Sequence, residues 1–337
     1  MINNKVILIT GGTGSFGNEL VKYLLKFYKP KKIIIFSRDE YKQDIMRSNF
    51  TSKQNKIIRY LLGDVRDLER LKMAMRGVHV VVHAAALKQV PAAEYNPMEF
   101  VKTNVHGAEN VVLASLQQNV KKIIALSTDK AANPINLYGS TKLASDKIFI
   151  AANKITGSNK NKFSIVRYGN VIGSRGSVVP LFLKNIKEKK KFLPITDERM
   201  TRFWFTLGQS VKFVIESLHM MNGGEIFIPK IPSIKIIDLA KAMAPSLRLK
   251  KIGIRPGEKL HELMCPKESS MNTIEFKNFF IIFSAQTNIN DKIKEFNKSI
   301  KQKAKKVAEN FEYNSFLNPQ YLSVEEIKKL HKSLNLI

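Results

Sequence analysis

Cysteine, tryptophan and long apolar runs are all scarce in this 337-residue chain. Its single cysteine, Cys265, excludes a disulfide framework and is typical of a protein kept in a reducing compartment. No stretch approaches the roughly 20 apolar residues that a membrane-spanning helix needs. The first apolar run, residues 5–10, is also too short for the core of a signal peptide. We therefore expect a cytoplasmic protein without a membrane partner.

Acidic residues are few as well. There are 28 Asp and Glu against 56 Lys and Arg, so the formal net charge is +28. Such an excess can indicate a nucleic acid, a membrane surface or an anionic ligand as partner. The lysines are spread along the whole chain, however, and the densest clusters (184–191 and 292–306) contain no arginine and look like solvated helix faces. We attribute the excess to compositional bias. A polyanion partner is the alternative, and nucleic acid that co-purifies and survives moderate salt would favour it.

Short β-branched runs alternate with amphipathic segments through the first two-thirds of the chain. The predicted strands are 5–10, 32–36, 57–62, 78–84, 122–127 and 163–168, and the predicted helices are 15–28, 39–50, 67–76, 97–119 and 137–154. This pattern predicts an α/β fold with a doubly wound parallel sheet of the Rossmann type. After Tyr168 come loops rich in Gly, Pro and Arg, then a helix (207–221), a strand (225–228) and a helix (234–244). We predict a dinucleotide-binding domain (1–168 and 207–229) interleaved with a smaller mixed α/β substrate lobe (169–206 and 230–337).

The sequence "ITGGTGSFG" follows the first predicted strand and opens the first predicted helix. Glycines here let the backbone turn tightly and approach a pyrophosphate, which the N-terminal N–H groups of the helix then receive. A glycine triplet in this context is a specific signal, and a simple glycine turn is the alternative. The predicted cofactor-binding residues of this turn are Gly11, Thr13, Gly14, Ser15, Phe16 and Gly17.

The second predicted strand ends in "FSRDE". An acidic residue directly at the strand end would favour NAD, but Ser37 and Arg38 come first and Lys42 follows one helical turn later. These residues favour the 2′-phosphate of NADP, although Asp39 is also present. Further predicted cofactor contacts follow the third and fourth strands: Asp64 and Val65 at the adenine, and Ala84, Ala85 and Ala86 along the cofactor, with Lys88 assigned to the substrate. For Asp64, a role at the start of the next helix is the alternative.

"STDKAANPINLYGSTK" places Thr-Asp-Lys at the end of the fifth predicted strand and Tyr-x-x-x-Lys on the next helix. Tyr138 and Lys142 are four residues apart and share a helix face. An ammonium group and a positively charged nicotinamide nearby would lower the pKa of the phenol. Tyr138 could then take a proton from a substrate hydroxyl while hydride leaves the same carbon, and Thr128 could hydrogen-bond that oxygen.

With these motifs, the chain resembles the extended short-chain dehydrogenases/reductases. More narrowly, it is similar to the NADP-dependent, inverting UDP-N-acetylglucosamine 4,6-dehydratases that open pseudaminic acid biosynthesis. The resemblance covers nearly the whole chain, through strings such as "GDVRDLER", "AAALKQVPAAEYNP", "VRYGNVIGSRGSVVP", "MTRFW" and "GIRPGEKLHE". The end of the chain, "FEYNSFLNPQYLSVEEI", also resembles the family, so we expect neither truncation nor fusion.

The resemblance implies a reaction for the two residues between Thr128 and Tyr138. Oxidation at C4 of the sugar acidifies the C5 proton, water is lost across C5–C6, hydride returns to C6, and C5 is reprotonated from the opposite face. The product would be UDP-2-acetamido-2,6-dideoxy-β-L-arabino-hex-4-ulose. Lys130 would be the C5 base and Asp129 the acid for the C6 oxygen, where retaining enzymes carry Thr-Asp-Glu. A lysine base must be neutral, which requires burial or a nearby cation such as Lys142.

The resemblance also implies the substrate site and the assembly. Val171 would lie on the cofactor side, and the positions implied for UDP-N-acetylglucosamine are Asn170, Arg175, Arg202, Arg255 and Glu258. The family suggests a homo-oligomer, a hexamer. The histidines show no metal-ligand spacing, and we expect no metal.

Two alternative functions remain open. One is another nucleotide-sugar enzyme of the same fold, a C4 epimerase or a retaining 4,6-dehydratase; Lys130 argues against the retaining type and the Asp-Lys pair against a simple epimerase. The other is a non-catalytic NADP- or RNA-binding protein, which the basic composition suggests. Thr128, Tyr138 and Lys142 are all present, and a binding-only protein has no need of all three.

Overall fold

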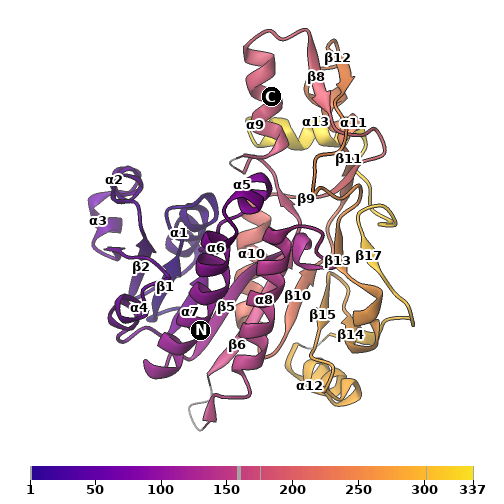
Figure 1. Cartoon of the computed structure of the whole chain (residues 1–337). Helices are drawn as coiled ribbons and strands as arrows, with labels where there is room; N and C mark the ends of the chain where they lie inside the picture. Colours follow the sequence, from indigo (N-terminus) through magenta and orange to yellow (C-terminus); the bar gives the residue numbers. More distant parts are fainter. Residues whose placement is uncertain (1, 158–160, 175, 301, 337) are drawn as a thin grey trace.

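A ten-stranded sheet forms the centre of the molecule, in the order β16-β14-β15-β10-β6-β5-β4-β1-β2-β3. The computed structural model describes residues 2–157, 161–174, 176–300 and 302–336. The strands from β3 to β10 run parallel, and β15, β14 and β16 extend one edge antiparallel. Helices cover the sheet on both sides (Figure 1). The predicted α/β, doubly wound Rossmann class is confirmed.

The parallel strands follow the predicted apolar runs closely. They are β1 (Val6–Thr10), β2 (Lys32–Ser37), β3 (Ile58–Leu62), β4 (Val80–His83), β5 (Lys122–Thr128), β6 (Lys162–Tyr168) and β10 (Ile226–Pro229). The helices between them include α1 (Ser15–Phe27), α2 (Glu40–Ser48), α3 (Ser52–Asn55), α4 (Leu68–Ala74), α5 (Val90–Tyr95), α8 (Leu137–Ala152) and α10 (Leu207–Met220).

The apolar character of these strands follows from burial on both faces. Successive side chains of a strand point to opposite sides of the sheet. Ile7 and Ile9 pack into the core beneath α1 and α10, whereas Leu8 packs into the core beneath α4, α7 (Gly107–Gln117) and α8. Both faces therefore require apolar residues, and the strands read as continuous apolar runs.

The helix predicted at 97–119 is interrupted. It consists of α6 (Pro97–Phe100), a π-helical turn η1 (Val101–His106) and α7 (Gly107–Gln117). Asn104 in the π-helical turn is buried; its Oδ1 accepts from the Leu87 N–H at 2.9 Å, and its Nδ2 donates to the Leu87 carbonyl at 2.9 Å and to Thr141 Oγ1 at 3.1 Å. The turn thus holds the loop after β4, as π-helical turns often do near functional sites.

The remaining elements lie after Thr128. They are the 3₁₀ turns η2 (Asp129–Ala131) and η4 (Lys267–Asn272), strands β7 (Asn170–Val171), β8 (Phe192–Ile195), β9 (Thr201–Phe205), β11 (Ser233–Lys235), β12 (Arg248–Lys251), β13 (Leu263–Cys265), β14 (Thr273–Glu275), β15 (Phe279–Ile282), β16 (Lys305–Lys306) and β17 (Tyr313–Asn314), and helices α9 (Val178–Lys187), α11 (Ile236–Met243), α12 (Ile289–Ile300) and α13 (Val324–Ser333). They add three small sheets, β11-β9-β7, β12-β8 and β13-β17.

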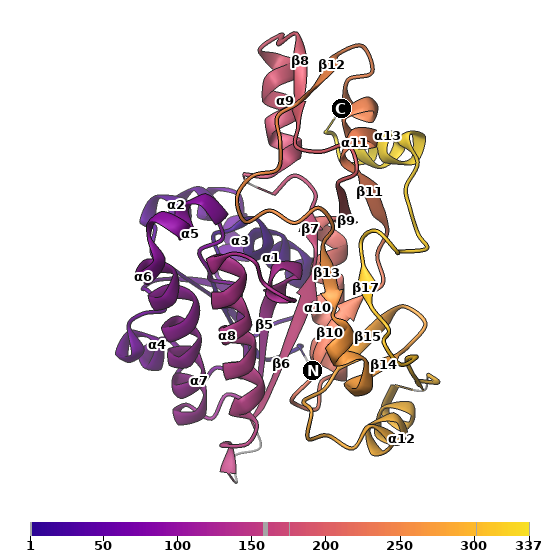
Figure 2. The same cartoon turned by 45° about the vertical axis from the view of Figure 1, so that its right-hand side comes forward.

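A separate small core supports the elements at the top of Figures 1 and 2. There α9, β8, β12, α11 and α13 gather around Phe182, Trp204 and Leu239. Below them, β14, β15 and β16 extend the large sheet, although their residues fall within the range that we assigned to the smaller lobe. The division into two lobes stays a prediction. Within the described ranges, every helix is too short or too polar to span a bilayer.

Candidate active site

A cavity of about 640 Å³ opens at the carboxyl ends of the parallel strands. It collects side chains that follow β1 to β6, which is where open parallel sheets bind their ligands. The predicted cofactor-binding residues on its wall are Gly11, Thr13, Gly14, Ser15, Phe16, Ser37, Arg38, Asp39, Lys42, Asp64, Val65, Ala84, Ala85, Ala86, Tyr138, Lys142 and Val171. Gly17 is absent from the wall, because it lies inside α1 against the backbone of Gly12.

The glycine turn provides a cradle for an anionic group. Gly11 has a φ of +64°, and a Cβ there would approach the Ala85 Cα to 2.8 Å, so only glycine fits. Gly14 precedes α1, where no side chain caps the helix and the first turn carries no acidic residue. The first N–H groups of α1 and its positive dipole end therefore suit a pyrophosphate.

Cationic side chains lie at the end of β2. Asp39 is engaged as the N-cap of α2: its Oδ1 accepts from the Lys42 N–H at 2.9 Å, and its Oδ2 pairs with Lys42 Nζ at 2.5 Å. Arg38 is half exposed, and its Nη1 lies 3.6 Å from Asp64 Oδ2. Asp64 does not begin α4, since Asp67 is the N-cap of that helix.

The Thr-Asp-Lys and Tyr-x-x-x-Lys motifs share one wall of the cavity. The Thr128 hydroxyl donates to Asp129 Oδ1 at 2.9 Å and accepts from the Lys130 N–H at 3.3 Å, which anchors η2. Tyr138 is the second residue of α8, two residues after the N-cap Asn136. These local hydrogen bonds bring the predicted catalytic residues together.

The environment of Tyr138 differs from our expectation. Lys142 Nζ donates to the Leu126 carbonyl at 2.8 Å. Burial raises the pKa of Tyr138 to about 12, against the lowering effects of Lys130 and of a side-chain hydrogen bond with Thr128. Within the protein, burial therefore outweighs the lysine effect that we predicted, and the lysine that lowers the phenol pKa is Lys130.

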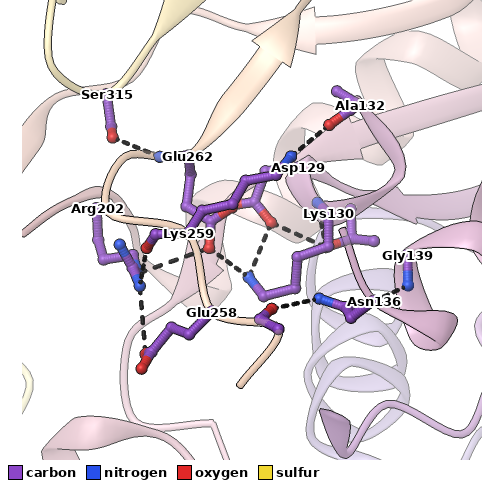
Figure 3. Close-up of polar contacts among 12 residues, drawn as sticks. Asp129, Lys130, Ala132, Asn136, Gly139, Arg202, Glu258, Lys259, Glu262 and Ser315 are labelled. Atoms are coloured by element: carbon purple, nitrogen blue, oxygen red, sulfur yellow. Dashed lines mark hydrogen bonds and ion pairs between the residues drawn. The ribbon is translucent and has the colours of Figure 1, made fainter. Parts of the chain in front are cut away.

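Lys130 lies between two buried carboxylates, as Figure 3 shows. Its Nζ is 3.1 Å from Asp129 Oδ1 and 3.0 Å from Glu262 Oε1. Burial lowers the pKa of Lys130, but Asp129 and Glu262 outweigh this effect and raise it well above its usual value. The role of Lys130 as the C5 base stays a prediction, and it requires the amine to lose a proton first, because two carboxylates rather than a second cation flank it.

The pKa of Asp129 is raised as well, and for a carboxyl group this favours the neutral form. Burial raises the pKa of its carboxyl, Glu262 raises it further, and the lowering effect of Lys130 is smaller. Its Oδ2 is buried and has no hydrogen-bond partner among the described residues. Asp129 is therefore the carboxyl of this pair that more readily takes a proton.

The predicted substrate-binding residues separate into two groups. Lys88, Asn170, Arg255 and Glu258 line the same cavity. Arg202 does not line it; this side chain is buried, and its guanidinium donates to Glu258 Oε1 at 3.3 Å and to backbone carbonyls. Arg175 lies outside the described residues.

Glu262 and Asn104 are parts of the site that the sequence did not identify. Glu262 directly precedes β13. Its segment "GEKLHE" was noted only as part of the family resemblance, and no spacing in the sequence links Glu262 to Lys130. Asn104 could have been identified only if the position of the π-helical turn had been known. Over the described residues, no group of His, Cys, Asp and Glu could hold a metal ion.

Comparison with known proteins places this site in a family. Residues 7–284 match the family model described as "Polysaccharide biosynthesis protein". A Campylobacter jejuni protein named UDP-N-acetylglucosamine 4,6-dehydratase (inverting) is 58% identical, over 97% of each chain. A Rickettsia rickettsii protein named UDP-glucose 4-epimerase is 40% identical, over 100% of this chain and 98% of its own.

Solved structures agree with this relationship. Pen from Bacillus thuringiensis is 37% identical, covers 100% of both chains and superposes with a TM-score of 0.89. The dTDP-glucose 4,6-dehydratase DesIV from Streptomyces venezuelae, solved with NAD bound, is 22% identical over 76% of this chain and 86% of its own; its TM-score of 0.66 supports the shared fold. By its glycine turn, its Tyr-x-x-x-Lys helix and its full-length relatives, the chain belongs to the polysaccharide biosynthesis protein family of extended short-chain dehydrogenases/reductases.

Proposed function

We propose that the protein is an inverting UDP-N-acetylglucosamine 4,6-dehydratase. The observation that carries the proposal is the pair formed by the buried Asp129 and the partly buried Lys130, with 3.1 Å between Oδ1 and Nζ, in the cavity that Tyr138 and the glycine turn also line. An acid and a base side by side suit the removal of a proton from one carbon and of a hydroxyl from the next. The name of the Campylobacter relative supports the same reaction.

The glycine turn (11–17), with Tyr138 and Lys142 beside it, would hold a nicotinamide dinucleotide, which would supply reversible hydride transfer for C4 and C6 of the sugar. Thr128 would hydrogen-bond the C4 oxygen, and Tyr138 in its ionised form would take the C4 hydroxyl proton. Lys130 would then remove the C5 proton, which a C4 ketone makes acidic, while Asp129 protonates the departing C6 hydroxyl. Reprotonation of C5 from the opposite face would invert that centre.

The charge of Lys130 determines how the Asp129–Lys130 pair can begin the loss of water. A protonated amine cannot act as a base, so its proton must leave first. The nearest acceptor whose pKa is raised is Asp129. Transfer of one proton from Lys130 Nζ to Asp129 Oδ1 would give a neutral amine and a carboxylic acid together. A single transfer therefore prepares both the base for C5 and the acid for the C6 oxygen.

The two lobes would divide the ligands. We assign the dinucleotide to 1–168 and 207–229, and the UDP-sugar to 169–206 and 230–337. Arg255, Glu258 and Asn170 reach the cavity from the second group, which supports this division. An arginine at the cavity suits a diphosphate, because its guanidinium can form two parallel hydrogen bonds.

We further propose NADP as the dinucleotide, since Arg38 and Lys42 stand at the cavity wall while Asp39 is engaged as a helix cap. The Arg38→Asp variant is expected to lose roughly 10- to 100-fold in affinity for NADP relative to NAD, the size expected for a hydrogen bond to a charged group. Titration calorimetry with both dinucleotides measures the ratio. Arg59→Asp, at an exposed position of β3 away from the cavity, makes the same charge change and is the control. An unchanged ratio would place the 2′-phosphate elsewhere.

The function is tested by incubating the protein with UDP-N-acetylglucosamine in deuterated water. We expect a 4-keto-6-deoxy product with deuterium at C5 and the L-arabino configuration by NMR. A C4 epimerase, which the Rickettsia relative's name makes the second candidate, would yield the C4 epimer with C5 unlabelled. A retaining dehydratase would keep the original C5 configuration, and either outcome would overturn the proposal.

A further inference from the structure

Glu262 reaches the reacting pair from a distant part of the chain. Its side chain is 1% exposed, and it is absent from the cavity wall. Its backbone is held on both sides by Ser315: the Glu262 N–H donates to Ser315 Oγ at 2.9 Å, and the Ser315 N–H donates to the Glu262 carbonyl at 2.8 Å. The carboxylate that contacts Lys130 therefore stands on a fixed backbone (Figure 3).

Arg202, together with Lys130, favours the ionised form of this carboxylate. Its Nε lies 3.6 Å from Glu262 Oε1, the same oxygen that contacts Lys130. The other nitrogens of Arg202 donate to the carbonyls of Thr201, Leu260 and Lys259, so the guanidinium cannot turn away. Burial raises the pKa of Glu262, but Lys130 and then Arg202 outweigh it and lower it overall.

The two carboxylates beside Lys130 are therefore unequal. Among the described residues Asp129 pairs with Lys130 and with no arginine, and its pKa is raised, whereas Glu262 also pairs with Arg202 and its pKa is lowered. A proton that leaves the amine has one favourable destination, Asp129. A permanent negative charge 3.0 Å from the amine also fixes its position and opposes that departure.

We propose that Glu262 is a positioning residue: it holds the Lys130 amine beside Asp129, and its charge sets the pH below which Asp129 and Lys130 are both protonated, so that Asp129 cannot take the proton of the amine. This inference rests on the proposed function, because it assigns Lys130 the role of the C5 base. The other ionisable groups that act on Lys130 or Glu262 come from several elements of the structure: Lys88, Asp129, Tyr138, Arg202 and Lys259. Glu258 pairs with Arg202.

The test is the pH profile of the Glu262→Gln variant. An amide can still accept a hydrogen bond from Lys130 but carries no charge, so the pKa of the amine falls. The acid limb of the kcat profile, followed as deuterium incorporation at C5, is expected to move to lower pH by about 1 to 3 units, the shift that one close charge produces. KM for UDP-N-acetylglucosamine is expected to stay unchanged, since Glu262 does not line the cavity.

Two further variants separate position from charge. Glu262→Asp keeps the negative charge on a side chain that is shorter by one methylene group. The acid limb of the kcat profile should therefore stay at the wild-type pH, while kcat falls. Glu275→Gln removes a carboxylate that likewise pairs with two cations, Lys230 and Lys305, but lies away from the cavity. This control should leave both the limb and kcat as in the wild type.

The outcomes are distinct. A wild-type protein that forms no inverted product contradicts the proposed function itself. A wild type that forms the product, with a Glu262→Gln limb at the original pH, contradicts the role of Glu262 alone. If Glu262→Gln does not fold, Glu262→Asp decides: slower C5 exchange at an unmoved limb supports the positioning role, and wild-type kcat overturns it.

Discussion

The Lys130→Ala variant is expected to form no dehydrated product while still binding the dinucleotide. Lys130 is the proposed base for C5, and loss of a positioned acid or base typically lowers a rate by roughly 10²- to 10⁴-fold. The step that is lost, deprotonation of C5, follows C4 oxidation in the proposed reaction. Mixing the variant with UDP-N-acetylglucosamine should therefore still give the absorbance of reduced nicotinamide, without release of product. NMR of the sugar and stopped-flow absorbance measure the two steps separately.

The controls for this variant follow from its surroundings. Without the amine, Asp129 and Glu262 face each other inside the protein, and an unpaired buried charge can cost about 3–5 kcal/mol. Melting temperatures must therefore accompany the kinetics, so that a folding loss is not taken for a catalytic one. Lys147→Ala, at an exposed position on α8, is the matched control and should leave turnover intact. Wild-type turnover in Lys130→Ala would remove the inverting assignment.

The Tyr138→Phe variant is expected to stop the reaction one step earlier. The hydroxyl that takes the C4 proton is gone, so C4 is not oxidised, the C5 hydrogen stays non-acidic, and deuterium does not enter at C5. The loss should again be roughly 10²- to 10⁴-fold. Neither reduced nicotinamide nor labelled sugar should appear, which distinguishes this variant from Lys130→Ala.

A phenylalanine at position 138 keeps the ring in its buried place, so the variant tests the hydroxyl rather than the packing. Tyr60→Phe removes a hydroxyl that hydrogen-bonds Asn55 away from the cavity, and exchange should persist in this control. Deuterium incorporation in Tyr138→Phe at the wild-type rate would mean that C5 deprotonation does not depend on C4 oxidation. The proposed order of steps would then be wrong.

Much of the parallel sheet could be predicted because its signals are local. Strands buried on both faces need apolar runs, and the runs at 5–10 and 122–127 correspond to β1 and β5 within a residue or two. The division of the helix at 97–119 could not be predicted, since the π-helical turn depends on Asn104 meeting Leu87 and Thr141 across space. The antiparallel extension by β14 to β16 depends equally on distant pairing.

The sequence by itself determined which reactive groups share the cavity. A strand end and a helix face, close in the sequence, carry these groups to the same wall: Thr128, Asp129, Lys130, Tyr138 and Lys142. Only the tertiary structure decided their charges. Ionisation depends on burial and on charges within a few ångströms, and the chain brings Glu262 and Arg202 to Lys130 through folding alone. For that reason the amine to which the family resemblance assigns the role of a base lies in the folded protein between two carboxylates that raise its pKa.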